Sequence, residues 1–225
     1  VRLIVHELEA DSRYYYRFKA GQDQTDLLGE TRTAPTADVA KTVNFAFASC
    51  QSYEGGYYQA YRTLLNEDAQ AAEQDKIDFV LHLGAFIYET LGYGSARKLP
   101  PFPSGGSKTG EDVEWASSHA DTLDDYRHLY KEYLSDPDLR EARAKWPFLV
   151  IWDDHEFTDD SWQGMSTYEI GGEPAQKRKY AANQAWFEFI PAHLTGHPGS
   201  STAHDFEEAG IEIKNAPFGQ IGRAH

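Results

Sequence analysis

Three short apolar runs constrain the fold of this chain more than any other feature. They cover residues 43–48, 78–83 and 148–152, and each is followed by residues able to do chemistry. Apolar runs of this length are typical of strands inside a sheet. Because segments with helical spacing lie between them, we expect the strands to run parallel in an α/β core.

Helical periodicity occupies the segments between and after these runs. Aromatic and aliphatic residues recur at helical spacing at Tyr58, Tyr61, Leu64 and Leu65. Further helices are predicted at residues 119–134, 137–145 and 174–190. Pro137 suits a first helical turn, where its missing N–H leaves no hydrogen bond unmade. Residues 91–116 are rich in Gly, Pro and Ser and are predicted to form a long surface loop.

The N-terminal part of the chain has the alternating pattern of β-structure instead. Strands are predicted at residues 1–5, 14–18 and 29–33. The spacing from Leu8 to Tyr14 resembles the tyrosine corner of fibronectin type III-like sandwiches, in which the hydroxyl bonds to the upstream backbone. The remaining strands of such a sandwich would lie upstream of Val1. The predicted organisation is therefore a partial sandwich at 1–34, a linker at 35–40 and the α/β domain at 41–225.

Composition excludes some classes of function. The net charge of −15 argues against binding to nucleic acid or to an anionic membrane. No apolar run of about 18 residues is present, so we expect no membrane span. No signal peptide is recognisable in the chain. Cys50 has no second cysteine with which to form an internal disulfide.

Reactive side chains follow all three predicted strands. Open α/β sheets bind ligands beyond the carboxyl ends of their strands, so these side chains are expected to converge. Carboxylates bind hard metal ions, and an imidazole transfers protons near neutral pH. The residues concerned are Cys50 after the first strand, Tyr88 and Glu89 after the second, and Asp153, Asp154 and His155 after the third.

Each of these residues also has a simpler interpretation when taken alone. A single cysteine is usually a small buried apolar residue, and a tyrosine usually packs in a core. His82, inside the second strand, is expected to be a core histidine. Asp159 and Asp160 suit a solvated turn or a helix cap.

Several segments together resemble the PhoD-type alkaline phosphatases, a family of secreted metallophosphoesterases. The segments are Phe45–Gln51, Leu81–Glu89, Asp125–Arg127, Ser135–Asp138 and Trp152–Glu156. The resemblance covers about 38–190 and implies the N-terminal part of a metallophosphoesterase α+β sandwich. It also implies hydrolysis of phosphate monoesters and diesters, and a location outside the cell or in the cell envelope or periplasm.

The resemblance further implies a metal centre that holds Fe(III) and Ca(II). On this analogy Cys50 and Tyr88 bind iron, Asp154 is a bridging or calcium-side ligand, and His155 is the catalytic residue at the phosphate. Thiolate and phenolate donors suit Fe(III), whereas calcium prefers carboxylate and carbonyl oxygens. Further ligand candidates are Asp153, Asp159 and Asp160.

Two departures from the family pattern predict impaired activity. Ala85 stands where the family has an aspartate that bridges the metals, and a methyl group cannot bind a metal. The chain also stops at His225, before the family's further strands and ligands, so we expect uncovered sheet edges and apolar faces. His193 and His197 have the spacing of a helical metal pair, but nearby prolines and a glycine disfavour a helix there.

Two other functions therefore stay open beside an impaired phosphate ester hydrolase. The chain is alternatively a catalytically inactive binding or structural module that retains the phosphatase fold. It is also compatible with an intracellular α/β protein whose lone cysteine is merely buried.

Overall fold

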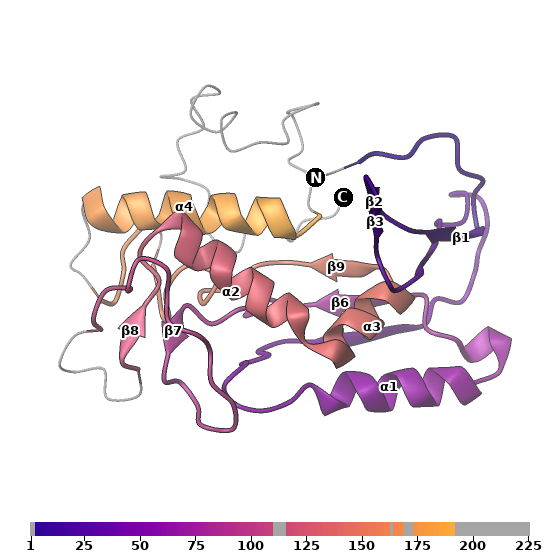
Figure 1. The fold of residues 1–225 in the computed structure, drawn as a ribbon. Helices are drawn as coiled ribbons and strands as arrows, with labels where there is room; N and C mark the ends of the chain where they lie inside the picture. The colour runs from indigo at the N-terminus through magenta and orange to yellow at the C-terminus, as the bar shows by residue number, and fades with distance from the viewer. Residues whose placement is uncertain (1–2, 110–115, 163, 169–172, 192–225) are drawn as a thin grey trace.

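The computed structural model describes residues 3–109, 116–162, 164–168 and 173–191, and it contains four sheets and four α-helices in these residues (Figure 1). The helices are α1 (Gln59–Gln70), the short 3₁₀ helix η1 (Glu73–Asp75), α2 (Leu123–Ser135), α3 (Pro137–Lys145) and α4 (Glu173–Phe189). The strands are β1 (Arg13–Tyr16), β2 (Lys19–Ala20), β3 (Asp23–Gln24), β4 (Gly29–Arg32), β5 (Phe45–Ala48), β6 (Phe79–His82), β7 (Thr90–Leu91), β8 (Ser118–His119) and β9 (Phe148–Val150).

The three predicted core strands form one parallel sheet in the order β5-β6-β9. Phe45 pairs with Phe79, and Leu81 pairs with Leu149. A helix lies between each strand and the next along the chain, which is the connection that parallel strands require. The predicted α/β core with parallel strands is therefore confirmed, with each strand slightly shorter than its apolar run.

Only one face of this sheet is buried in the described residues. Val80, His82 and Phe148 point into the core beneath the helices. Phe45 and Phe47 on the opposite face are 52% and 71% exposed. The apolar runs thus form strands as predicted, but the strands are buried only on the face that the helices cover. The exposed phenylalanines match the expectation of an uncovered apolar face.

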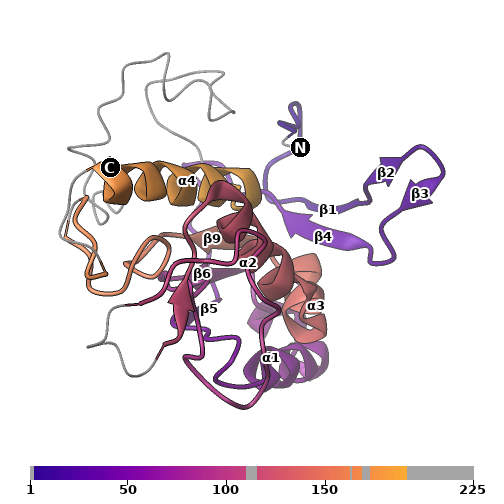
Figure 2. The same cartoon turned by 60° about the vertical axis from the view of Figure 1, so that its left-hand side comes forward.

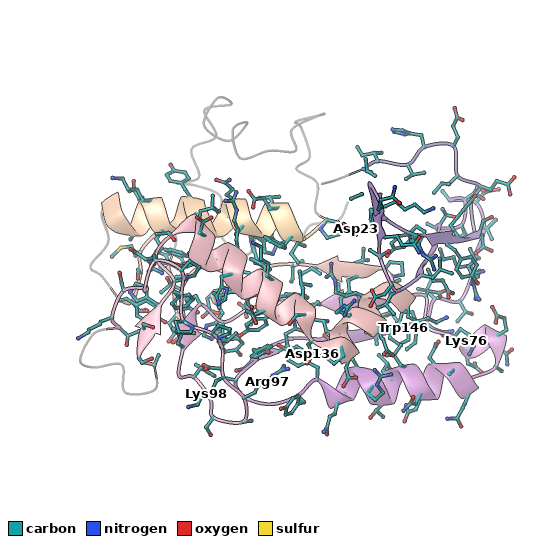
Figure 3. All side chains as sticks on the ribbon, viewed as in Figure 1. Asp23, Lys76, Arg97, Lys98, Asp136 and Trp146 are labelled. Atoms are coloured by element: carbon teal, nitrogen blue, oxygen red, sulfur yellow. The ribbon has the colours of Figure 1, made fainter. Side chains whose placement is uncertain are left out.

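The helices begin and end where local chemistry favours it. The Thr122 side chain and the Asp125 carboxylate form a capping box at the start of α2. Asp136 caps α3, and Pro137 lies in its first turn as predicted. Asp136 also pairs with Arg97, 2.6 Å away, and Figure 3 shows the two side chains beside each other. None of the helices in the described ranges is long and apolar enough to cross a membrane.

The N-terminal strands form two small antiparallel sheets, β1-β4 and β2-β3, that project from the α/β body (Figure 2). The Tyr14 hydroxyl accepts a hydrogen bond from the Glu9 backbone N–H at 2.8 Å, which is the contact expected of a tyrosine corner. A fibronectin-like sandwich is not shown. Residues 3–5 are exposed and form no strand, since no neighbouring strand pairs with them in the described part of the chain.

The segment predicted as a long surface loop is partly packed into the core. Thr90 and Leu91 form β7, which pairs with β8. Leu99 and Phe102 are 8% and 3% exposed and belong to the main core cluster. A composition rich in Gly and Pro predicts irregular backbone, but it does not predict whether that backbone is covered.

The loops after β6 and β9 are joined through one buried carboxylate. Glu156, 1% exposed, accepts hydrogen bonds from the backbone N–H groups of Ala85, Phe86 and Asp153, at 3.1, 2.5 and 2.6 Å. Burial raises the pKa of Glu156 to about 7, although the three hydrogen bonds favour its ionised form. This side chain therefore fixes the position of one strand end relative to the next.

Glu156→Gln should destabilise the chain by about 2–3 kcal/mol, because an amide NH₂ replaces an oxygen that faces N–H donors. Glu67→Gln, at an exposed position on α1, is the matched control and should change stability by less than about 0.5 kcal/mol. Urea unfolding measures both. Equal stability of the two variants would show that the carboxylate is not needed to join the loops.

His82 should make the chain sensitive to acid. Burial lowers the pKa of His82 from 6.5 to about 4, and neither ring nitrogen has a hydrogen-bond partner in the described structure. Between these pH values the unfolded chain binds more protons than the folded chain, so the free energy of unfolding should fall as the pH drops from 6.5 to about 4. The loss from this group is about 3 kcal/mol.

His82→Leu should remove this part of the acid sensitivity, because leucine does not titrate. His6→Gln, at an exposed position, is the control and should leave the pH dependence as it is. Urea unfolding at several pH values from 4 to 7 gives the slopes, with the pH range set by the pKa values above. An unchanged slope in His82→Leu would assign the acid sensitivity to other groups.

Candidate metal centre

The ends of β5, β6 and β9 meet at one edge of the sheet. Backbone N–H groups of Cys50 and Gln51 donate to the carbonyls of Gly84 and Ala85, both at 3.1 Å. Glu156 joins the second of these loops to Asp153, as described above. The predicted convergence of the strand ends is therefore present, and it brings most of the predicted site residues together.

Cys50 lies beside Tyr88 at this edge. Burial raises the pKa of Tyr88, and the nearby Cys50 side chain raises it further. Cys50 is exposed and has a left-handed backbone, with φ of 57°. The hypothesis of a merely buried cysteine is wrong, because the thiol lies at the surface of the site. Strained backbone of this kind is found most often at functional positions.

His155 is held between two carboxylates. Its Nδ1 lies 2.8 Å from Glu89, and its Nε2 lies 3.3 Å from Asp159. The Tyr88 ring stacks on the imidazole, with the ring centroids 3.9 Å apart. Burial lowers the pKa of His155, but Glu89, Asp154 and Asp159 outweigh burial, so the pKa lies above its ordinary value. The imidazole is thus oriented and favoured in its protonated form.

Three carboxylates next to this histidine have the arrangement of a cation site. Oxygens of Asp154, Asp159 and Asp160 lie within 4.8 Å of one another. Asp154 accepts hydrogen bonds from the backbone N–H groups of His155 and Asp160, which fix its orientation. Asp153, predicted as a ligand, is exposed and is not in this group.

The donors present suit the implied metals in part. Cys50 and Tyr88 offer a thiol and a phenol, and the aspartate cluster offers the hard oxygens that calcium prefers. Ala85 lies three residues before Tyr88 in the chain, is fully buried, and has no side-chain donor atom. Its backbone is left-handed, with φ of 49°, a conformation that Asp and Asn adopt more readily than Ala. The backbone conformation at position 85 therefore suits the aspartate that the family resemblance implies there.

Two residues that shape the site have no role predicted from the sequence. Glu89 is predicted only to follow a strand, yet both its oxygens are bonded: Oε2 to His155, and Oε1 to the Asp159 N–H and the Tyr168 hydroxyl. Its position directly after Tyr88 was the available signal. Tyr93 lay inside the predicted surface loop and gave no signal. His193, His197 and His225 lie outside the described residues.

Comparison with known proteins finds a matching family model, a related protein and a similar solved structure. A model of the family described as PhoD-like phosphatase matches residues 45–207. Alkaline phosphatase D of Bacillus subtilis (strain 168) is 38% identical over 193 residues, which cover 85% of this chain and 30% of that protein. A solved structure described as "Structure of PhoD" matches with a TM-score of 0.61 at 36% identity, covering 85% of this chain and 33% of that one.

The chain thus spans about a third of the length of these two relatives. The family match extends over most of the chain and includes all three core strands and the residues at their ends. The chain belongs to the PhoD-like phosphatase family.

Proposed function

We propose that this chain carries part of the metal centre of a phosphate ester hydrolase, a metal-dependent phosphatase and phosphodiesterase. One observation carries the proposal: Cys50, Tyr88 and His155 lie together at the edge where three parallel strands end, beside a cluster of aspartates. Membership of the family supports the reaction class. Phosphate esters are the substrate class.

We propose Cys50 and Tyr88 as the ligands of Fe(III), and Asp154, Asp159 and Asp160 as the ligands of Ca(II). Thiolate and phenolate match the first ion, and clustered carboxylates match the second. Asp153 is a weaker ligand candidate because it stands apart from the cluster. Bound metal ions would supply positive charge to polarise the phosphoryl group.

His155 is proposed as the catalytic residue that acts at Nε2. Glu89 fixes the ring through Nδ1, so that Nε2 points toward the aspartate cluster. A proton on Nε2 could be donated to the leaving oxygen or to a phosphoryl oxygen. The Tyr88 ring prevents the imidazole from turning away.

Activity is proposed to be impaired because Ala85 supplies no bridging ligand. Loss of a carboxylate between two cations leaves their mutual repulsion unscreened and lowers metal affinity. The same observation favours a second function, an inactive binding or structural module that retains the fold. Hydrolysis of an aromatic phosphate ester at alkaline pH, abolished by a chelator, would exclude the inactive module.

Ala85→Asp should raise the iron and calcium bound per chain, with an affinity gain of about tenfold or more. Ala85→Asn is the matched control, since it has the same shape and the same tolerance of left-handed backbone but no charge. Elemental analysis after dialysis against both metals measures the result. Equal metal content in the two variants would contradict the proposed ligand set.

Glu89→Gln should lower the pKa of His155, because the neutral amide no longer favours the protonated ring. NMR titration of the metal-free chain measures this pKa without any need for activity. Glu67→Gln, on the exposed side of α1, serves as control and should leave the His155 pKa unchanged. An unshifted pKa in Glu89→Gln would remove the assigned role of Glu89.

A further inference from the structure

Tyr93 is a second tyrosine beside the candidate metal centre. Its ring centroid lies 4.7 Å from that of Tyr88 and 5.7 Å from that of His155, edge-on to the imidazole. Burial, followed by the charges of Asp159, Cys50, Glu89 and Asp154, raises the pKa of Tyr93, so the phenol faces the acidic side of the site. The residue is nevertheless 41% exposed, so part of the ring is open to solvent.

The loop that carries Tyr93, residues 92–99, is held by a buried carboxylate. Glu54 is 5% exposed and accepts hydrogen bonds from the backbone N–H groups of Gly92 at 2.7 Å and Tyr93 at 3.0 Å. The Glu54 carbonyl accepts another from Ala96 at 3.0 Å. Both the side chain and the backbone of one residue therefore fix the backbone on which the Tyr93 ring stands.

Two further contacts leave this loop little freedom. A Cβ added at Gly94 would lie 2.4 Å from the Glu54 carbonyl oxygen, so only glycine permits this approach. Arg97 donates to the Tyr53 carbonyl and to Asp136, each at 2.6 Å, and its guanidinium lies 3.7 Å from the centre of the Tyr53 ring. The backbone that carries the Tyr93 ring is thus held in place before any ligand arrives.

We propose that Tyr93 is a specificity-determining residue, whose ring contacts the ester group of the substrate and favours an aromatic group there. The inference rests on the proposed function, because it needs a phosphoryl group held near His155. A tyrosine on a fixed backbone, 41% exposed as a residue, offers a flat apolar ring surface at little cost in conformational entropy. Glu54 is the positioning residue of this ring.

Phenylphosphonate and methylphosphonate test the inference, because neither has an ester bond to hydrolyse. Isothermal titration of the full chain, loaded with iron and calcium, gives the two affinities, and competition by inorganic phosphate shows that both occupy one site. The chain should bind the phenyl compound about fivefold or more tightly than the methyl compound. Tyr93→Ala should abolish most of this preference and leave the methylphosphonate affinity unchanged.

Three further variants separate a specific role from a structural one. Tyr93→Phe keeps the ring and should keep the preference. Glu54→Gln should reduce the preference without weakening methylphosphonate binding. Tyr180→Ala, at a tyrosine of similar exposure on α4, should change nothing.

The outcomes distinguish this inference from the function on which it rests. Equal binding of the two phosphonates, or a preference that survives Tyr93→Ala, would overturn the role of Tyr93 and leave the proposed function standing. An equal loss of both affinities in Tyr93→Ala would show a structural role only, and would also overturn the inference. Failure of the metal-loaded chain to bind either phosphonate would remove the proposed function, and the inference with it.

Discussion

The geometry of the site depends most on the hydrogen bonds that the buried Glu156 carboxylate accepts. The carboxylate joins the loops after β6 and β9 through backbone N–H groups of both. A parallel sheet brings the strand ends to one edge, but it does not fix the loops that follow them. A metal centre needs these loops, and the ligands on them, to be held in fixed positions. Backbone groups bound to a buried carboxylate cannot shift without leaving buried donors or an acceptor unsatisfied, which costs about 1–3 kcal/mol each.

A second constraint follows from the sharp turns that these loops make. Cys50 and Ala85 both adopt left-handed backbone shortly after a strand. The two segments are joined by hydrogen bonds from the Cys50 N–H to the Gly84 carbonyl and from the Gln51 N–H to the Ala85 carbonyl. Such backbone costs roughly 1 kcal/mol or more for a residue with a Cβ, so the surrounding bonds must hold it. The same turns direct the residues at 50 and 85 to one edge of the sheet. The left-handed turns at Cys50 and Ala85 are therefore the source of both the backbone strain and the position of these residues in the site.

Much of this arrangement could be predicted from the sequence, because it depends on local pattern. The three core strands, the helices between them and the position of Pro137 follow from periodicity and from backbone chemistry. The meeting of Cys50, Tyr88 and His155 follows from the parallel topology. The role of Glu54 could not be predicted, since its partners lie 38 and 39 positions away and are backbone groups that any residue possesses. An uncovered apolar face was expected, but residue type could not show that it is the face of Phe45 and Phe47, because an apolar strand has the same composition whichever of its faces is covered.

Ala85 separates the two halves of the proposed centre in a specific way. The thiol and phenol of Cys50 and Tyr88 remain, and the aspartate cluster remains, but Ala85 supplies no carboxylate to link them. The two donor sets should therefore bind metals as separate sites, each with its own affinity. The aspartate cluster keeps its three carboxylates and its orienting backbone hydrogen bonds. On the proposed ligand set, calcium binding should therefore suffer less than iron binding, for which the described residues offer a thiol and a phenol. On the proposed ligand set, alanine at position 85 would weaken the coupling of the metals more than the fold, because Glu156 holds the strand ends through the backbone of residue 85 and not through its side chain.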